Sequence, residues 1–206
     1  MDGKDLELVK SLMKELKKVD NPGTILLNTS TTQIAKTNFF LLKGLLDLED
    51  KKGYFMSLDR PHQNMAYLLN NHDINQENIW YIDTVNHLSR RKRVDRENVD
   101  FVNNAFQIEK LAGILEEKEG KRKDFGTLEN IDFVLIDNLS TVSNYNNIDK
   151  IQDFLSSFED LIISHDNLIG CLVMDSDSNE ELDRIVRKHV KNIINVKKLK
   201  EDIKNG

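Results

Sequence analysis

The sequence predicts a single α/β domain built on a mostly parallel β-sheet with helices on both faces, a three-layer arrangement. Short apolar runs of strand length alternate along the chain with longer segments of helical periodicity. Parallel strands require crossover connections, and right-handed crossovers place helices on the faces of the sheet. The 206 residues, of which 39% are hydrophobic, suffice for one sizeable core, so one domain is expected rather than two.

Composition narrows the class of protein. The net charge is −6 with 31% charged residues, which argues against neutralising nucleic-acid phosphates over a broad surface. Cys171 is the only cysteine, so a disulfide framework and a cysteine metal site are excluded. The first ten residues lack the layout of a signal peptide, and no apolar run approaches the roughly 20 residues that a membrane helix needs. A cytoplasmic protein without membrane association is expected.

The chain begins with an amphipathic segment. Apolar residues recur at helical spacing between lysines and glutamates over 4–19, which predicts a helix that ends at the turn 20–23. We therefore divide the chain into an N-terminal amphipathic helix, 1–21, and an α/β domain, 22–206. The helix is expected to bury its apolar stripe on its own domain, and self-association is the alternative. A strand is predicted at 24–28, followed by a helix at 36–48.

The middle of the chain continues the alternation. Strands are predicted at 53–58 and 79–83, with a helix that starts near Pro61 between them, because proline is tolerated in the first turn. A helix is expected at 99–119, flanked by the charged segments 89–97 and 116–126. The basic residues of 90–96 fit a solvated loop or a docking surface for an acidic partner.

The last part of the chain resumes the sheet. Strands are predicted at 131–137, 167–175 and 192–196, and helices at 148–163 and 179–190. The charged tail after residue 196 is expected to be solvated. Ligands bind such sheets at the carboxyl ends of the strands, so the residues that follow Asn28, Leu58, Asp83, Asp137 and Asp175 are the ones to inspect.

The segment between the first strand and its helix has the length and place of a phosphate-binding loop, G-x-x-x-x-G-K-[ST]. Lys36 is expected to reach the β- and γ-phosphates, and Thr37 to ligate Mg²⁺ at a helix N-terminus that favours anions. Ser30 and Ala35 replace the glycines that let the backbone approach phosphates closely. ATP or ADP with Mg²⁺ is the predicted ligand, and an ordinary helix start is the alternative. The nucleotide-binding prediction covers Ser30, Thr31, Thr32, Gln33, Ala35, Lys36 and Thr37.

A second motif lies in the segment 131–137. An apolar strand that ends in Asp137 matches a Walker B strand, whose terminal aspartate holds Mg²⁺ through water. Many buried strands end in aspartate only because its side chain caps the following turn. The pattern gains weight because it follows the loop in the expected order. Thr37 and Asp137 are the predicted metal ligands.

A third segment, which contains the second predicted strand, resembles a motif of a known protein family. KaiC-like ATPases carry a stretch of the type G-x-Y-x-S-L-E-E-S after the Walker A helix, and Gly53, Ser57 and Leu58 match it. The DNLS segment at 137–140 resembles the D-S-L-S that follows their Walker B strand. The chain thus resembles the RecA/KaiC-like P-loop ATPases from about residue 22 to 196. It also resembles small archaeal proteins that keep a KaiC-like core without a good phosphate loop. The resemblance implies a RecA-like fold.

The resemblance also bears on catalysis. In the family, paired glutamates after the second strand polarise the attacking water. Here the pair is Asp59-Arg60, so the carboxylate sits on a shorter side chain beside a fixed positive charge. Together with the lost glycines, this change predicts a non-hydrolysing homologue with a regulatory, scaffolding or nucleotide-sensing role. The resemblance further implies a protein partner or self-association.

The sequence is also compatible with two other functions. A slow ATPase would use Asp59 in place of the family glutamate, whereas a pure interaction module would fill the phosphate site with its own side chains. The acidic cluster at 175–181 fits a capping box from Ser178 to Glu181 better than a cation site. The five histidines show no metal-binding spacing and are expected at the surface.

Overall fold

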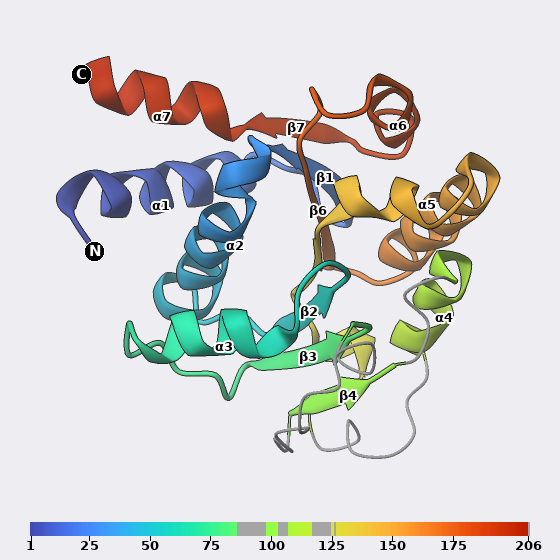
Figure 1. Cartoon of the computed structure of the whole chain (residues 1–206). Coiled ribbons are helices and arrows are strands. Elements are labelled where there is room, and N and C mark those ends of the chain that lie inside the picture. Colours follow the sequence, from blue (N-terminus) through green and yellow to red (C-terminus); the bar gives the residue numbers. More distant parts are fainter. Residues whose placement is uncertain (86–97, 103–106, 117–124, 126, 206) are drawn as a thin grey trace.

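The computed structural model describes residues 1–85, 98–102, 107–116, 125 and 127–205. These residues form a seven-stranded sheet in the order β4-β3-β2-β5-β6-β1-β7, and every pair of neighbouring strands runs parallel. Helices cover both faces of the sheet (Figure 1). The predicted three-layer α/β fold is therefore confirmed.

The strands follow the apolar runs closely. Every residue of β1, β2, β3 and β5 is buried, as expected for parallel strands that are covered on both faces. The strands are β1 Gly23–Asn28, β2 Gly53–Ser57, β3 Ile79–Asp83, β4 Val99–Phe101, β5 Phe133–Asp137, β6 Ile169–Met174 and β7 Asn192–Asn195.

Each sheet face has its own hydrophobic core. The first is closed by α1 Gly3–Leu16, α2 Ile34–Lys43, its π-helical extension η2 Gly44–Leu48, α3 His62–Asn70 and α7 Val196–Asn205. The second is closed by α4 Leu111–Glu116, α5 Ile148–Ile163 and α6 Glu180–Val186. Short 3-10 turns complete the described elements: η1 Thr31–Gln33, η3 Ile108–Lys110, η5 Leu128–Asn130 and η6 Leu139–Asn144.

The N-terminal helix α1 packs on its own chain. Its buried stripe, which includes Leu12 and Met13, contacts α2, η2 and α7. At Gly44 of η2 an added Cβ would lie 2.5 Å from Cε of Met13, so the Met13 side chain fills the space that a larger residue would need there. Helices α1 and α7 lie side by side, and the two chain ends lie at the same end of this pair (Figure 1).

Two expectations about the helices are wrong. The segment 99–119 is not one helix: its described residues begin with strand β4, and helix forms only from Ile108 to Glu116. Val99 is buried on the sheet edge, where it pairs with Tyr81 of β3. The tail after residue 196 is not solvated on all sides: it lies in helix α7, whose Leu199 and Ile203 pack against the first core. The basic segment 90–96 lies outside the described residues.

No described helix combines the length and apolar character needed to cross a membrane.

Candidate functional site

Buried polar side chains gather where β1, β2 and β5 end. In a parallel sheet these carboxyl ends share one edge, which is where such folds bind ligands. The buried polar residues at and after the three strand ends, with two from the start of α2, are Asn28, Thr29, Thr37, Asn38, Ser57, Asp137 and Asn138. This edge is the candidate site.

The loop that follows β1 is a tight turn. Ser30 has an extended backbone, and η1 then runs directly into α2 at Ile34. The N–H groups of Gln33 and Ile34 donate to the carbonyls of Ser30 and Thr31, respectively. Because these donors are used within the turn, they do not line an open phosphate cradle. Ala35, at the second glycine position, lies in the first turn of α2.

Asp175, which follows β6, is hydrogen-bonded to the first residue of η1 in this turn, Thr31. Its Oδ2 accepts hydrogen bonds from the N–H and the hydroxyl of Thr31, each at 2.8 Å, and its Oδ1 accepts one from Lys197 Nζ at 3.1 Å. Burial raises the pKa of Asp175, but the hydrogen bonds from Thr31 and Lys197 outweigh it and hold the pKa below its usual range. A fixed carboxylate thus occupies the start of the turn.

The acidic cluster around Asp175 does not form the predicted capping box. Helix α6 is capped by Asn179, whose side chain accepts from the N–H of Leu182, while the Ser178 hydroxyl donates to the carbonyl of Asp175. Among the described residues no group of His, Cys, Asp and Glu has the arrangement of a metal site.

Lys36 points towards α1. Its Nζ lies 2.8 Å from Oδ1 of Asp5 and 5.1 Å from the centre of the Phe40 ring. The next residue, Thr37, is fully buried, and its Oγ1 is 3.0 Å from Oγ1 of Thr29. Lys36, the predicted phosphate ligand, therefore faces α1, whereas Thr37, the predicted magnesium ligand, faces the buried end of β1.

Asp137 ends β5 at the same sheet edge. Burial raises its pKa to about 6, Asn38 opposes the rise, and the charge of Asp59 adds to it. Asn38 is fully buried, and its side-chain amide has no partner with hydrogen-bond geometry among the described residues. It nevertheless lies close enough to Asp137 to lower the pKa of that carboxyl. The sequence alone did not single out Asn38; a polar residue directly after Lys36-Thr37, at a position that the helix buries, is the signal for it.

Asp59 and Arg60, which follow β2, form an ion pair. Arg60 Nε lies 3.5 Å from Oδ2 of Asp59, and the Asp59 side chain is 30% exposed. The carboxylate in the place of the family glutamates thus has a guanidinium beside it.

His62 departs from the expectation of surface histidines. Its side chain is fully buried, and Nδ1 lies 2.6 Å from Oδ2 of Asp83, at the end of β3. The same carboxylate oxygen accepts the His62 backbone N–H at 2.9 Å. The ring atom Nε2 has no hydrogen-bond partner among the described residues. The pair fixes the start of α3 to the sheet, beside the Asp59-Arg60 turn.

Comparisons with known structures agree with this architecture. The chain is similar to an uncharacterised protein from Pyrococcus horikoshii crystallised with an unknown peptide (TM-score 0.65, 12% identity, covering 89% of this chain and 81% of that one). It is also similar to the flagellar accessory protein FlaH from Methanocaldococcus jannaschii (TM-score 0.56, 17% identity, 88% and 76%). A further Pyrococcus horikoshii protein matches with a TM-score of 0.58 at 10% identity over 89% and 86%.

These similarities define the class of fold. The chain has a three-layer α/β fold of the RecA-like type, and at such low identities the likeness extends to the fold alone. Neither a scan against protein-family models nor a search of curated proteins finds a match.

Proposed function

We propose that this chain is a degenerate KaiC-like ATPase homologue that does not hydrolyse ATP and acts as a regulatory or scaffolding protein. The observation that carries the proposal is the state of the phosphate loop. In the turn after β1, the N–H groups of Gln33 and Ile34 have acceptors inside the turn and that of Thr31 donates to Asp175. Lys36 is paired with Asp5. Hydrolysis needs a loop that already surrounds the phosphates, because positioning and electrostatics supply most of the catalysis.

Nucleotide binding remains part of the proposal as a sensing function. Lys36 would have to leave Asp5, and this step is cheap, because the lysine side chain is 48% exposed and exposed pairs contribute roughly 0–1 kcal/mol. Thr37 and Asp137 would hold Mg²⁺, which prefers oxygen ligands and would favour the ionised form of Asp137. ATP or ADP binding would thereby reorganise the contact between α1 and α2.

A slow ATPase is the second candidate. The observation in its favour is that the charge of Asp59 acts on Asp137, which places a carboxylate within electrostatic range of the proposed metal ligand. The Arg60 guanidinium beside Asp59 favours the non-hydrolysing reading instead.

A scaffolding role requires a protein partner or a second copy of the chain. The Pyrococcus horikoshii neighbour was crystallised with an unknown peptide, which supports protein binding by this fold. Size-exclusion chromatography with light scattering, with and without Mg-ATP, tests whether nucleotide changes the association state.

The enzymatic part is tested by measuring phosphate release and, by calorimetry, Mg-ATP binding. We expect no release above background, and any binding to weaken about tenfold in Lys36→Ala, the loss of one good charge contact. Lys43→Ala is the control, because Lys43 lies in the last turn of α2 and pairs with Asp47. Phosphate release that Asp59→Asn abolishes would establish the slow ATPase and contradict the proposal.

A further inference from the structure

We propose that the pocket between α1, the turn at 30–33 and α7 binds a compact polyanion that carries phosphate groups. The pocket measures about 450 Å³, within the range of roughly 300–1,000 Å³ that is usual for small-molecule sites. Thr37, Asn38 and Asp137 do not line it, so it is distinct from the Mg²⁺ site proposed above. The pocket shares Ser30, Thr32, Gln33 and Lys36 with the predicted nucleotide-binding loop, but the inference requires neither Mg²⁺ at the sheet edge nor hydrolysis there.

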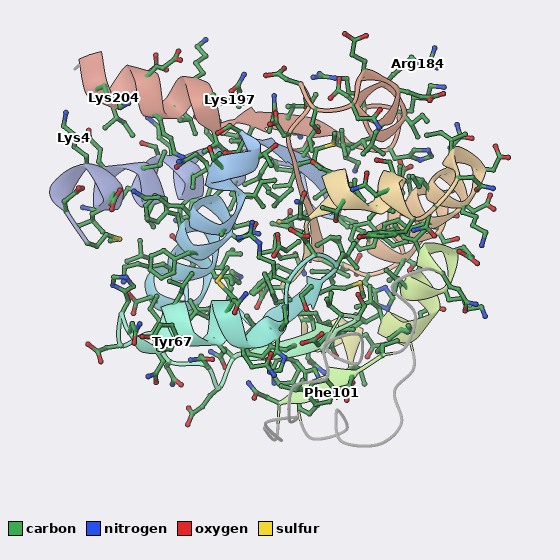
Figure 2. All side chains as sticks on the ribbon, viewed as in Figure 1. Lys4, Tyr67, Phe101, Arg184, Lys197 and Lys204 are labelled. Carbon is green, nitrogen blue, oxygen red and sulfur yellow. The ribbon has the colours of Figure 1, made fainter. Side chains whose placement is uncertain are left out.

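Lysines from helices α1, α2 and α7 converge on this pocket. Lys197, Lys200 and Lys204 come from α7 at spacings of three and four residues, which puts them on one face of the helix. Lys4 of α1 and Lys36 of α2 complete the set. Figure 2 shows Lys4, Lys197 and Lys204 along the pair of helices α1 and α7. We call these five residues the lysine cluster.

The lysine cluster has more positive charge than its own chain neutralises. Asp5 and Glu201 are the two carboxylates that line the pocket. Lys36 pairs with Asp5, and Lys197 pairs with Asp175 and Asp177. Lys4, Lys200 and Lys204 form no ion pair with any described residue. In a chain of net charge −6, such a concentration of unpaired lysines favours an anionic ligand.

The pKa of Lys200 reflects the neighbouring positive charges. It is half-buried, and its Nζ donates to Oε1 of Gln33 at 3.1 Å. Burial lowers the pKa of Lys200, and the charges of Lys36 and Lys204 lower it further, while the charge of Asp5 opposes this fall in part. A phosphate group in the pocket would offset this repulsion, since a lysine ammonium presents three donors to an anion.

The wall opposite α7 offers neutral polar groups. Ser30, Thr32 and Gln33 line the pocket at the start of α2, and neither Ser30 nor Gln33 caps its helix with a side-chain hydrogen bond. The side chains and the dipole of the helix start are what this wall offers an anion, since the N–H groups of Thr31, Gln33 and Ile34 already have acceptors. This polar wall, together with the lysine cluster, suits phosphate oxygens. The pocket's size favours a small molecule over a chain segment.

Calorimetric titration with inorganic triphosphate in magnesium-free, low-salt buffer tests the proposal. We expect Lys200→Gln/Lys204→Gln to weaken binding about tenfold or more, the loss of two charge contacts. The control Lys188→Gln/Lys198→Gln removes the same charge from exposed positions outside the pocket and should stay within about twofold. Raising the salt concentration should weaken wild-type binding, because salt screens these charges.

Four results would overturn the proposal, the last of them with an acidic peptide. One is no binding at millimolar triphosphate, and another is equal weakening in the two double variants. The third is binding that needs Mg²⁺ and is lost in Asp137→Asn, which would place the ligand at the sheet edge instead. An oligoglutamate peptide that binds more tightly than triphosphate, through the same lysines, would assign the pocket to an acidic protein segment and contradict a small polyanion. Thermal melting of each variant verifies that it is folded.

Discussion

Asp175 holds Thr31 through two hydrogen bonds, one from the backbone N–H and one from the hydroxyl, both at 2.8 Å. The two residues are 144 positions apart, so the contact ties the end of β6 to the turn after β1. An aspartate side chain thus takes up a backbone donor at the start of the segment where the sequence predicts phosphate binding.

The first prediction concerns this contact. Asp175→Asn should lower the free energy of unfolding at pH 7 by about 1–2 kcal/mol, because charge-assisted hydrogen bonds are replaced by weaker ones. The pKa of Asp175 is lowered in the folded state, so the stabilisation exists above the unfolded pKa and is lost as pH falls through the folded pKa. Urea denaturation at pH 7 and pH 3 measures both effects.

Asp177→Asn is the matched control for that experiment. The Asp177 side chain is 80% exposed and shares only Lys197 with Asp175, so its replacement should change stability by less than about 0.5 kcal/mol. If the two variants lose equal stability, the Thr31 contact contributes nothing of its own.

The second prediction is a pH-dependent gain in stability. Burial raises the pKa of Asp137 to about 6 from 3.8, so its ionisation opposes folding. The penalty is absent below the unfolded pKa, grows as pH rises, and is complete above about 6. Asp137→Asn should therefore stabilise the protein at pH 8, by up to about 3 kcal/mol, and leave it unchanged near pH 4.

Urea denaturation of Asp137→Asn and wild type across this pH range is the measurement. Added Mg²⁺ should narrow the difference if the carboxylate takes part in a metal site, since a cation favours its ionised form. A variant that is less stable than wild type at pH 8 would mean that neighbouring groups compensate the buried charge.

The third prediction concerns the buried pair of His62 and Asp83. His62→Leu removes the Nδ1 partner of a fully buried carboxylate, so the free energy of unfolding should fall by about 3 kcal/mol. His72→Leu, at an exposed histidine just after α3, should cost less than about 0.5 kcal/mol. Thermal or chemical unfolding measures both. Equal losses would show that the effect comes from histidine chemistry in general and not from this pair.

The sequence predicted the sheet well because its central strands are continuous apolar runs. IWYID becomes β3 with the predicted bounds, and the helix at 148–163 is α5. The predictions were wrong where contacts between segments far apart in the sequence decide the structure. Helix α7 carries few apolar residues, and what makes it a packed helix is α1, which lies at the other end of the chain.

The candidate site was predictable in its location but not in its internal contacts. The order of the motifs along the chain, each directly after a predicted strand, placed Lys36, Thr37 and Asp137 near the carboxyl edge of the sheet. The direction of a side chain, however, depends on which partner lies within reach. Lys36 meets Asp5, and Asn38 is buried close to Asp137, through pairings that no local pattern encodes. Whether the segment 30–37 binds nucleotide stays a prediction.

The fourth prediction compares two glycines. At Gly53 an added Cβ would lie 2.5 Å from Cγ of Phe133 and would also overlap the Phe133 carbonyl oxygen, in the middle of the sheet. Gly53→Ala should therefore cost about 2–3 kcal/mol, because backbone cannot shift cheaply there. Gly113, in α4, has nothing within 4 Å of an added Cβ, so Gly113→Ala should stabilise by about 0.5–1 kcal/mol through helix propensity. Denaturation of both variants measures this difference in sign. A tolerated Gly53→Ala would mean that β2 and β5 can separate locally, which is incompatible with the close contact at Phe133.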